Sequence, residues 1–213
     1  MITFAKIGLI LLCFVSFGCA HSTPKDLSAF RTEAPHSILV VPVVNKSVEI
    51  TAADYFLATI SVPLGEKGYY VFPVNLIKRV LEDDGLSDAS LVHEASPKRL
   101  CDLFGADAVL YVNIERWDAQ YLVLTTTVTV EFTYVIKSGK TDQVLWSERM
   151  KMVYQPPSNG SLLAAVINAA IAKAAPNYMP LAKQANSQVF AYPGPGVPAG
   201  PYNEMYKKDI EIN

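Results

Sequence analysis

An alternation of apolar and polar residues from Gln120 to Lys137 constrains the fold more than any other part of this 213-residue chain. Successive side chains of a β-strand point to opposite faces, so the pattern predicts one long strand with a packed face and a face that is wet or contacts a partner. The packed face would carry Leu122, Leu124, Thr126, Val128, Val130, Phe132, Tyr134 and Ile136. A turn at Ser138–Asp142 and a second alternation over Val144–Tyr154 complete a predicted hairpin, long enough to bend or to project from its sheet.

The other apolar runs predict an α/β domain, with helices packed on a mixed sheet of about five strands. The further expected strands are Ser37–Val44, Tyr69–Phe72 and Ala106–Ile114. The expected helices are Thr51 or Ala52 to Glu66, Val74–Glu82, Ser96–Phe104 and two C-terminal helices, Ser161–Ala175 and Pro180–Phe190. The run Ala106–Ile114 is nearly continuous in apolar residues, which is typical of a strand buried on both faces, so we place it at the centre of the sheet.

Single residues predict where some of these elements begin or end. Pro42 cannot donate to a β ladder, so pairing on one side of the first strand should end near it. Pro63 should disturb the last turn of the first helix. Ser96 suits a helix N-cap. The expected apolar faces are Leu76, Ile77, Val80 and Leu81 on the second helix, and Val144, Trp146, Met150, Met152 and Tyr154 on the last strand.

The start of the chain predicts export. Lys6 precedes an apolar run, Ile7–Phe17, that ends in small residues. A charged start, an apolar stretch of about 7 to 15 residues and small residues at the cut are typical of a secretory signal peptide. The run is shorter than the roughly 20 apolar residues of a membrane span. We therefore predict that residues 1–18 are removed.

A cysteine directly after this segment predicts a lipid anchor. Gly18 and Cys19 match the bacterial lipoprotein box, whereas Ser16 stands where that box usually has Leu and Phe17 stands where it usually has a small residue. The alternative is a soluble secreted protein, cut after Gly18 or after Ala20. Several acyl chains on Cys19 would hold the protein stably on a membrane. Ala20 directly follows Cys19, at the position where lipoproteins retained in the inner membrane often carry Asp. The predicted destination is therefore the outer membrane.

We divide the chain into a signal peptide (1–18), a lipidated N-terminus and polar tether (19–36), a single α/β domain (37–192) and a flexible tail rich in Pro and Gly (193–213). With Cys19 acylated, Cys101 is the one free cysteine of the mature chain, so an intramolecular disulfide is excluded. Its neighbours Leu100, Leu103 and Phe104 predict a small buried hydrophobe rather than a nucleophile.

No motif in the sequence predicts catalysis, a cofactor or a metal. The segment Ser138–Thr141 resembles the end of a phosphate-binding loop, but strands flank it on both sides where a helix should follow, so we interpret it as a hairpin turn. Glu82–Gly85 lacks the alternating ligands of a calcium loop, and His93 has no second His at metal-ligand spacing. The formal charge of −2 becomes −3 on loss of Lys6, which argues against nucleic acid as a partner.

Four segments carry a family resemblance: VVPVVNKS (Val40–Ser47), GYYVFPV (Gly68–Val74), Ser96–Val112 and SGKTDQVLW (Ser138–Trp146). In their order and spacing they resemble a family of predicted bacterial lipoproteins of unknown function that includes a genome-derived neisserial antigen. The resemblance covers most of Ile38–Phe190. Departures are the weak lipoprotein box and the Ala-rich segment after Gly160.

Similar layouts of strands and helices occur in the amino-terminal domain of the Tol-system propeller protein and in the periplasmic domain of the curli secretion-channel lipoprotein. These resemblances imply a small α/β domain that binds envelope proteins and has no known catalytic centre.

Three functions follow as hypotheses. The leading one is a non-enzymatic, membrane-anchored interaction module in an envelope assembly, accessory to secretion or transport, with other envelope proteins or a second copy as partners. The first alternative is an oligomeric secretion-channel subunit that uses Gln120–Tyr154 as a spanning hairpin, although charges on a lipid-facing strand are costly. The second alternative is an envelope hydrolase.

Overall fold

The computed structural model describes residues 25–121, 126–154, 178–190 and 196–208. The signal peptide, Cys19 and the predicted helix Ser161–Ala175 lie outside these ranges. In the described part, six strands form one mixed sheet with the order β3-β1-β4-β5-β6, and β2 pairs with β4. The strands are β1 (Ser37–Val40), β2 (Val44–Asn45), β3 (Tyr70–Val71), β4 (Ala108–Tyr121), β5 (Thr126–Ser138) and β6 (Val144–Tyr154). The prediction of an α/β fold with a mixed sheet is confirmed.

Parallel and antiparallel pairing meet at β4. β1 and β2 pair with it in parallel, with Ile38 opposite Ala108 and Val44 opposite Asn113. β5 pairs with its other side in antiparallel register, and β6 follows β5 in the same way. Pro42 stands in the gap between β1 and β2, which confirms that it interrupts the ladder.

The long alternation is divided between two strands, which corrects the prediction of a single strand from Gln120. Tyr121 is the last residue of β4 and pairs with Thr126 at the start of β5, so Gln120 and Tyr121 belong to the preceding strand. A period of two continues across a hairpin as well as along a strand, so the sequence pattern does not separate these cases.

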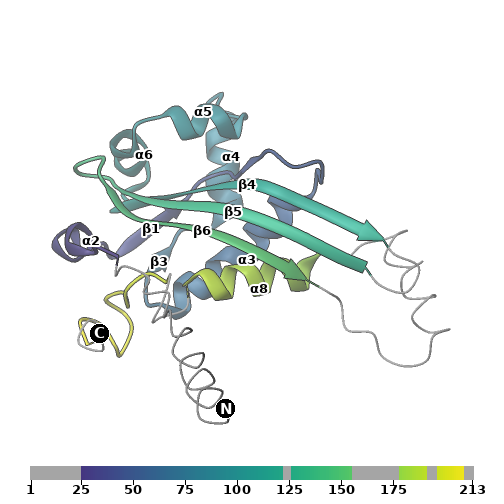
Figure 1. Cartoon of the computed structure of the whole chain (residues 1–213). Helices are drawn as coiled ribbons and strands as arrows, with labels where there is room; N and C mark the ends of the chain where they lie inside the picture. Colours follow the sequence, from purple (N-terminus) through teal and green to yellow (C-terminus); the bar gives the residue numbers. More distant parts are fainter. Residues whose placement is uncertain (1–24, 122–125, 155–177, 191–195, 209–213) are drawn as a thin grey trace, which may run out of the picture.

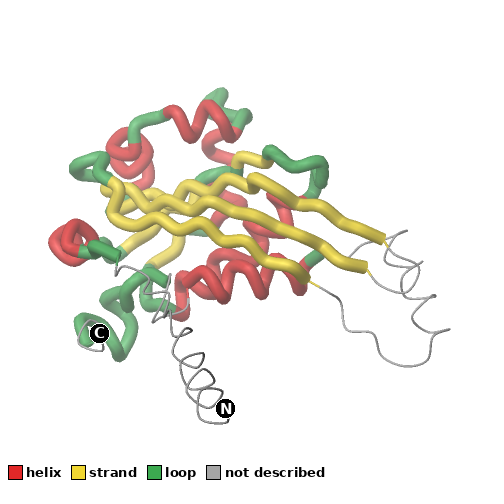
Figure 2. The backbone as a smooth tube through the Cα atoms, in the orientation of Figure 1, coloured by secondary structure: helices red, strands yellow, loops and turns green. Residues whose placement is uncertain are grey.

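Helices cover the two faces of the sheet unequally (Figure 1). One face packs against α3 (Ala52–Glu66) and α8 (Met179–Phe190), and the residues from β5 in this core are Val128, Val130, Phe132, Tyr134 and Ile136. The packed face predicted for β5 is therefore confirmed at these positions. The opposite face packs against α4 (Val74–Asp83), α5 (Ala89–Glu94) and α6 (Pro97–Phe104), beside β1, the first part of β4 and Val135 of β5. The far half of β4, β5 and β6 is seen without a helix in front of it (Figure 2).

A buried polar network joins α3, α8 and β5. The Asn186 side chain donates to Thr59 Oγ1 at 2.9 Å and to the carbonyl oxygen of Phe56 at 3.3 Å, and its Oδ1 accepts from the Tyr134 hydroxyl at 3.4 Å. Burial raises the pKa of Tyr134. Because a buried polar group without a partner is costly, this network specifies how α8 lies on α3 and on the sheet.

Two local predictions of buried residues need correction. Leu76 is 59% exposed, because α4 turns Val74, Ile77 and Leu81 towards the core instead. Val144 is 51% exposed, while Leu145 and Trp146 are both buried, because the register shifts between Ile136 and Lys137 and breaks the alternation.

The N-terminus of α6 is held differently from the prediction. Ser96 is its N-cap residue, but its hydroxyl makes no capping bond within the helix. Asp142, in the β5–β6 turn, instead accepts from the backbone N–H of Lys98 at 3.0 Å. α5 was not expected from the sequence, whereas α3 continues through Pro63 to Glu66.

Described residues from both predicted flanking segments pack on the core. In the predicted tether, the helix α2 (Ser28–Glu33) buries Phe30 against Tyr69, with ring centroids 6.3 Å apart. Before α2, the Lys25 ammonium lies over the Trp146 ring and forms an ion pair with Glu148 on β6. Lys25 and α2 therefore belong to the packed domain, although they lie in the segment 19–36 that was predicted to be a tether.

The predicted flexible tail is buried over residues 196–200. Gly200 N–H donates to the Lys67 carbonyl at 2.7 Å, and Tyr202 N–H donates to the Gly68 carbonyl at 3.0 Å. The Tyr69 hydroxyl donates to the Pro198 carbonyl at 2.7 Å. The segment packs here because two glycine backbones meet: a Cβ on Gly200 would lie 2.4 Å from the Gly68 oxygen.

We predict that Gly200→Ala detaches this segment from the α3–β3 turn. The added Cβ meets backbone atoms, which cannot rotate away, so we expect a loss of about 1–3 kcal/mol in the free energy of unfolding. Thermal unfolding measures the loss of stability, and limited proteolysis after residue 195 measures the detachment of the segment. Gly65→Ala is the matched control: its Cβ has nothing within 4 Å, and it lies in α3, so stability should hold or rise. Equal stability of the two variants would contradict the prediction.

Candidate interaction surface

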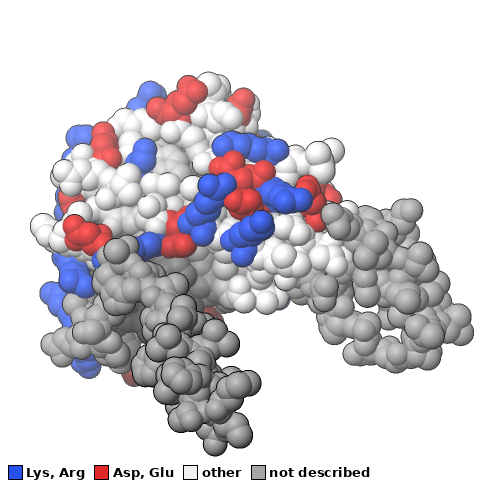
Figure 3. Space-filling model, viewed as in Figure 1, with Lys and Arg blue, Asp and Glu red and all other residues white. Residues whose placement is uncertain are grey.

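The far half of the sheet leaves a polar face that no described helix covers. We call it the outer sheet face, and none of its members is buried. Its residues are Asn113, Glu115, Arg116, Asp118, Thr129, Glu131, Thr133, Arg149, Lys151 and Val153. Lys, Arg, Asp and Glu gather in the middle of this face (Figure 3). The wet or partner-contacting face predicted for the long strand is therefore a surface on which both charge signs are interspersed.

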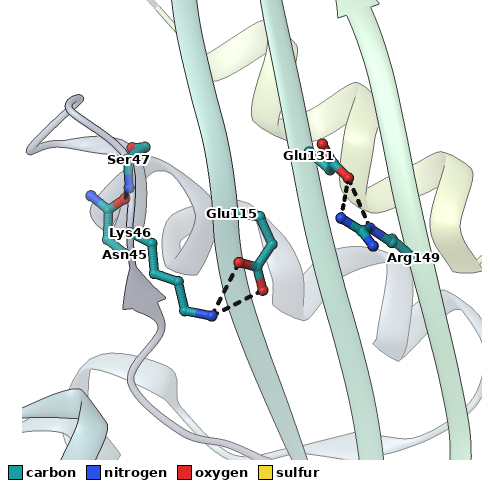
Figure 4. Close-up of polar contacts among 6 residues, drawn as sticks. All are labelled: Asn45, Lys46, Ser47, Glu115, Glu131 and Arg149. Atoms are coloured by element: carbon teal, nitrogen blue, oxygen red, sulfur yellow. Dashed lines mark hydrogen bonds and ion pairs between the residues drawn. The ribbon is translucent and has the colours of Figure 1, made fainter.

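One ion pair on the outer sheet face joins β5 to β6 (Figure 4), and another lies within β4. The Arg149 guanidinium on β6 contacts Glu131 Oε1 on β5 at 2.6 Å. On β4, the Arg116 guanidinium contacts Asp118 at 2.5 Å. Exposed pairs of this kind contribute only about 0–1 kcal/mol to stability, since water screens them. The folded state therefore depends little on them, and their charges are accessible to a partner.

A hydrogen-bonded loop, residues 45–51, stands beside this face. Asn45 Oδ1 accepts from the Ser47 backbone N–H at 3.0 Å and from the Ser47 hydroxyl at 2.7 Å, and its Nδ2 donates to the Glu49 carbonyl at 2.7 Å. Glu49 Oε1 accepts from the Thr51 backbone N–H and hydroxyl. Lys46 connects the loop to β4 by an ion pair with Glu115 at 3.0 Å (Figure 4). The loop is braced although it carries no regular secondary structure after Asn45.

The bracing of this loop was not predicted from the sequence, which indicated only a connection between the strand Ser37–Val44 and the helix that follows. A signal was present, because short polar side chains at Asn45, Ser47, Glu49 and Thr51 alternate with other residues. Asn and Ser side chains commonly bond to the backbone two residues on. What the alternation could not show is that Val48 and Ile50 then point into solvent, 87% and 88% exposed.

The candidate reactive residues lie apart from the outer sheet face. Cys101 is buried, as predicted, and desolvation raises the pKa of its thiol to about 12, so it stays protonated at neutral pH. His93 Nε2 lies 2.9 Å from the Pro42 carbonyl oxygen, and burial lowers the pKa of its imidazole. Its ring meets Tyr111 edge-on at 5.1 Å. The Tyr111 hydroxyl is buried without a hydrogen-bond partner.

The phosphate-loop resemblance at Ser138–Thr141 is a hairpin turn between β5 and β6, as predicted. Ser138 Oγ accepts from the backbone N–H groups of Lys140 and Thr141 at 3.0 and 3.1 Å, so these donors face their own side chain instead of a phosphate. In the described residues no group of three or more His, Cys, Asp or Glu is placed to hold a metal ion.

A family model described as "Putative lipoprotein GNA1162-like" matches residues 25–192. The chain belongs to this family. A "Putative lipoprotein NMB1124/NMB1162" from Neisseria meningitidis serogroup B is 33% identical over 147 residues, which are 68% of this chain and 68% of the relative. Membership implies export and lipid anchoring in the cell envelope. No enzyme is named for the family or this relative.

A solved structure of a family member supports the fold. The crystal structure of lipoprotein GNA1162 from N. meningitidis has a TM-score of 0.55 and 30% identity, and the match covers 66% of this chain and 97% of that one. The PelC dodecamer from Paraburkholderia phytofirmans has a TM-score of 0.45 at 15% identity over 72% of this chain and 85% of that one, a likeness that carries no functional argument. The family resemblance seen in the sequence is confirmed, and the Tol-system and curli resemblances stay predictions. Over the described residues, no helix is long and apolar enough to span a membrane.

We predict that Asn45→Ala loosens the 45–51 loop. The substitution removes one side chain that makes three hydrogen bonds in the loop, so hydrogen exchange at residues 46–51 should accelerate and unfolding free energy should fall by about 1–2 kcal/mol. Hydrogen-exchange mass spectrometry measures the loop directly. Lys46→Ala, which removes only an exposed ion pair, should change stability by less than about 1 kcal/mol. Unchanged exchange in Asn45→Ala would show that the backbone alone holds the loop.

Proposed function

We propose that this chain is a non-enzymatic lipoprotein of the bacterial envelope whose outer sheet face binds another envelope protein, as an accessory to secretion or transport. The observation that carries the proposal is the contrast between the two faces of β5. One face is packed under α3 and α8, while the other carries Thr129, Glu131 and Thr133 among acidic and basic side chains of the neighbouring strands. Lipoprotein family membership and the export signal support an envelope location.

The mixed charge specifies the chemistry of the partner surface. Glu131 stands opposite Arg116 on one side and Lys151 on the other, so acidic and basic groups alternate across the strands. A surface of one sign would meet repulsion from part of this pattern, whereas a protein surface with interspersed acidic and basic side chains can match it group by group. Such matching gives specificity and a fast association rate more than raw affinity.

No observation on the described residues favours the two alternatives, a channel subunit and a hydrolase. The apolar residues of β5 that a spanning hairpin would need on its lipid side contact α3 and α8 in the domain core. The thiol of Cys101, the one free cysteine of the described residues, is buried, and the rise in its pKa opposes use as a nucleophile. The channel subunit and the hydrolase therefore stay hypotheses.

Reversing two charges on the outer sheet face should abolish partner capture. We predict that Arg149→Glu with Lys151→Glu lowers the yield of in-cell cross-links to an envelope partner at least about tenfold, since like charges would face the acidic groups of the partner. Quantitative mass spectrometry of cross-linked complexes measures the yield. Lys78→Glu with Arg79→Glu on α4 makes the same change in net charge elsewhere and should leave the cross-links intact. A partner captured equally by both variants would refute a role for this face.

The lipid anchor is tested separately at Cys19. We predict that Cys19→Ser moves the protein from the outer-membrane fraction to the soluble periplasmic fraction, because the acyl chains supply the membrane affinity. Density-gradient separation of envelope membranes followed by immunoblotting measures the distribution. Unfolding of the variant should match that of the parent protein, and an unchanged membrane fraction would show that another element anchors the chain.

A further inference from the structure

The tip of the 45–51 loop displays two apolar side chains that have no place in the core. Val48 and Ile50 are 87% and 88% exposed, and the Asn45, Ser47 and Glu49 bonds hold the backbone that carries them. Single exposed apolar residues are ordinary on protein surfaces. Two branched side chains at the end of a braced loop are different, because the backbone that carries them has already lost conformational entropy before any partner binds.

An apolar pocket lies elsewhere on the same chain. It has a volume of about 220 Å³ and is lined by the end of α2, Tyr69 and the packed C-terminal segment. Its apolar lining includes Phe30, Pro35, Tyr69, Pro198 and Ala199, while Arg31 and Lys207 also line it. An apolar protein cavity of about 150 Å³ holds a benzene molecule, so this pocket is large enough for branched aliphatic side chains.

The backbone around this pocket is strained. Ala34 has φ 43° and Lys207 has φ 62°, and both line the pocket. Asp142 is the only other non-glycine residue with positive φ in the described part of the chain. This conformation is costly for residues with a Cβ and persists where the surrounding structure requires it, which happens often at binding sites. Ala34 adopts this conformation as the C-cap of α2, where its N–H donates to the Phe30 carbonyl at 2.9 Å, so the end of this helix forms part of the pocket wall.

The loop tip and the pocket lie at opposite ends of the segment that contains β1 and β2. Pro35, in the pocket lining, lies two residues before β1, and the loop begins at Asn45, the end of β2. At about 3.3 Å per residue, the segment between them spans roughly 30 Å. Figure 1 shows α2 and the loop between β2 and α3 on opposite sides of the molecule. One molecule therefore cannot insert its own tip into its own pocket.

We propose that Val48 and Ile50 of one copy insert into the Phe30–Tyr69–Pro198 pocket of a second copy. Apolar tip and apolar pocket match in chemistry, and the Glu49 carboxylate of the loop is opposite in sign to Arg31 and Lys207 in the pocket lining, while Lys46 of the loop is paired with Glu115. The contact joins different surfaces of the two copies, so it is head-to-tail and repeats along an assembly. It uses neither the ion pairs nor the threonines of the outer sheet face and goes beyond the function proposed for that face.

Cysteine cross-linking in the envelope fraction of cells tests the contact. Two differently tagged full-length copies are co-expressed, one with Ile50→Cys and one with Arg31→Cys, and a short bis-maleimide is added to the envelope fraction. We expect a cross-linked dimer that carries both tags. Cys101 is buried with a raised pKa, so it supplies little background. Adding Val48→Asp to the Ile50→Cys copy should lower the yield at least about tenfold, since an exposed apolar anchor becomes a charge.

The matched control replaces Ile50→Cys by Leu103→Cys, an exposed apolar position on α6, and should give no dimer with Arg31→Cys. A yield no higher than this control would overturn the proposal. Dimers between two Ile50→Cys copies would also overturn it, because they indicate a two-fold contact, and so would capture of Ile50→Cys solely by a different protein. Arg149→Glu with Lys151→Glu should leave the tip-to-pocket cross-link unchanged, so the proposed function and this contact can fail independently.

Discussion

The sheet depends on β4, because this strand is where the two kinds of pairing meet. It accepts β1 and β2 in parallel on one side and β5 in antiparallel register on the other. β1 and the first part of β4 are buried on both faces, which requires helices on both sides. Beyond Tyr111 the helices on the second face end, and the same strand continues as the support of an open polar surface. One strand therefore connects the core to the interaction surface.

Packing on one face allows the other face to be polar. The Phe56, Phe132 and Tyr134 rings contact one another with centroids 5.7 to 5.9 Å apart. This aromatic core, with the Asn186 network beside it, holds β5 in place from one side. Charges on the outer sheet face then contribute little to stability, so substitutions there can change binding without unfolding the domain.

Patterns with a period of two or 3.6 predicted most elements well. The faces of β5, the helices α3, α6 and α8 and the turn after Ser138 follow from local alternation, proline and glycine signals. Predictions failed where the deciding contact is distant in sequence. Asp142 holds the start of α6, a register shift buries Leu145, and Gly68 packs the segment around Gly200. None of these partners is visible within a local window.

By itself, the sequence determined the class of fold, the buried face of the long strand and the family, and it predicted export and the lipid site at Cys19. These properties depend on residues close together in the chain or on their order. Tertiary structure alone decided that Phe30 and residues 196–200 belong to the core, that Val48 and Ile50 stand exposed on a braced loop, and that a pocket forms between α2 and the C-terminal segment. The physical reason is that burial is a property of the assembled surfaces, and residues far apart in the sequence create those surfaces only when the chain has folded.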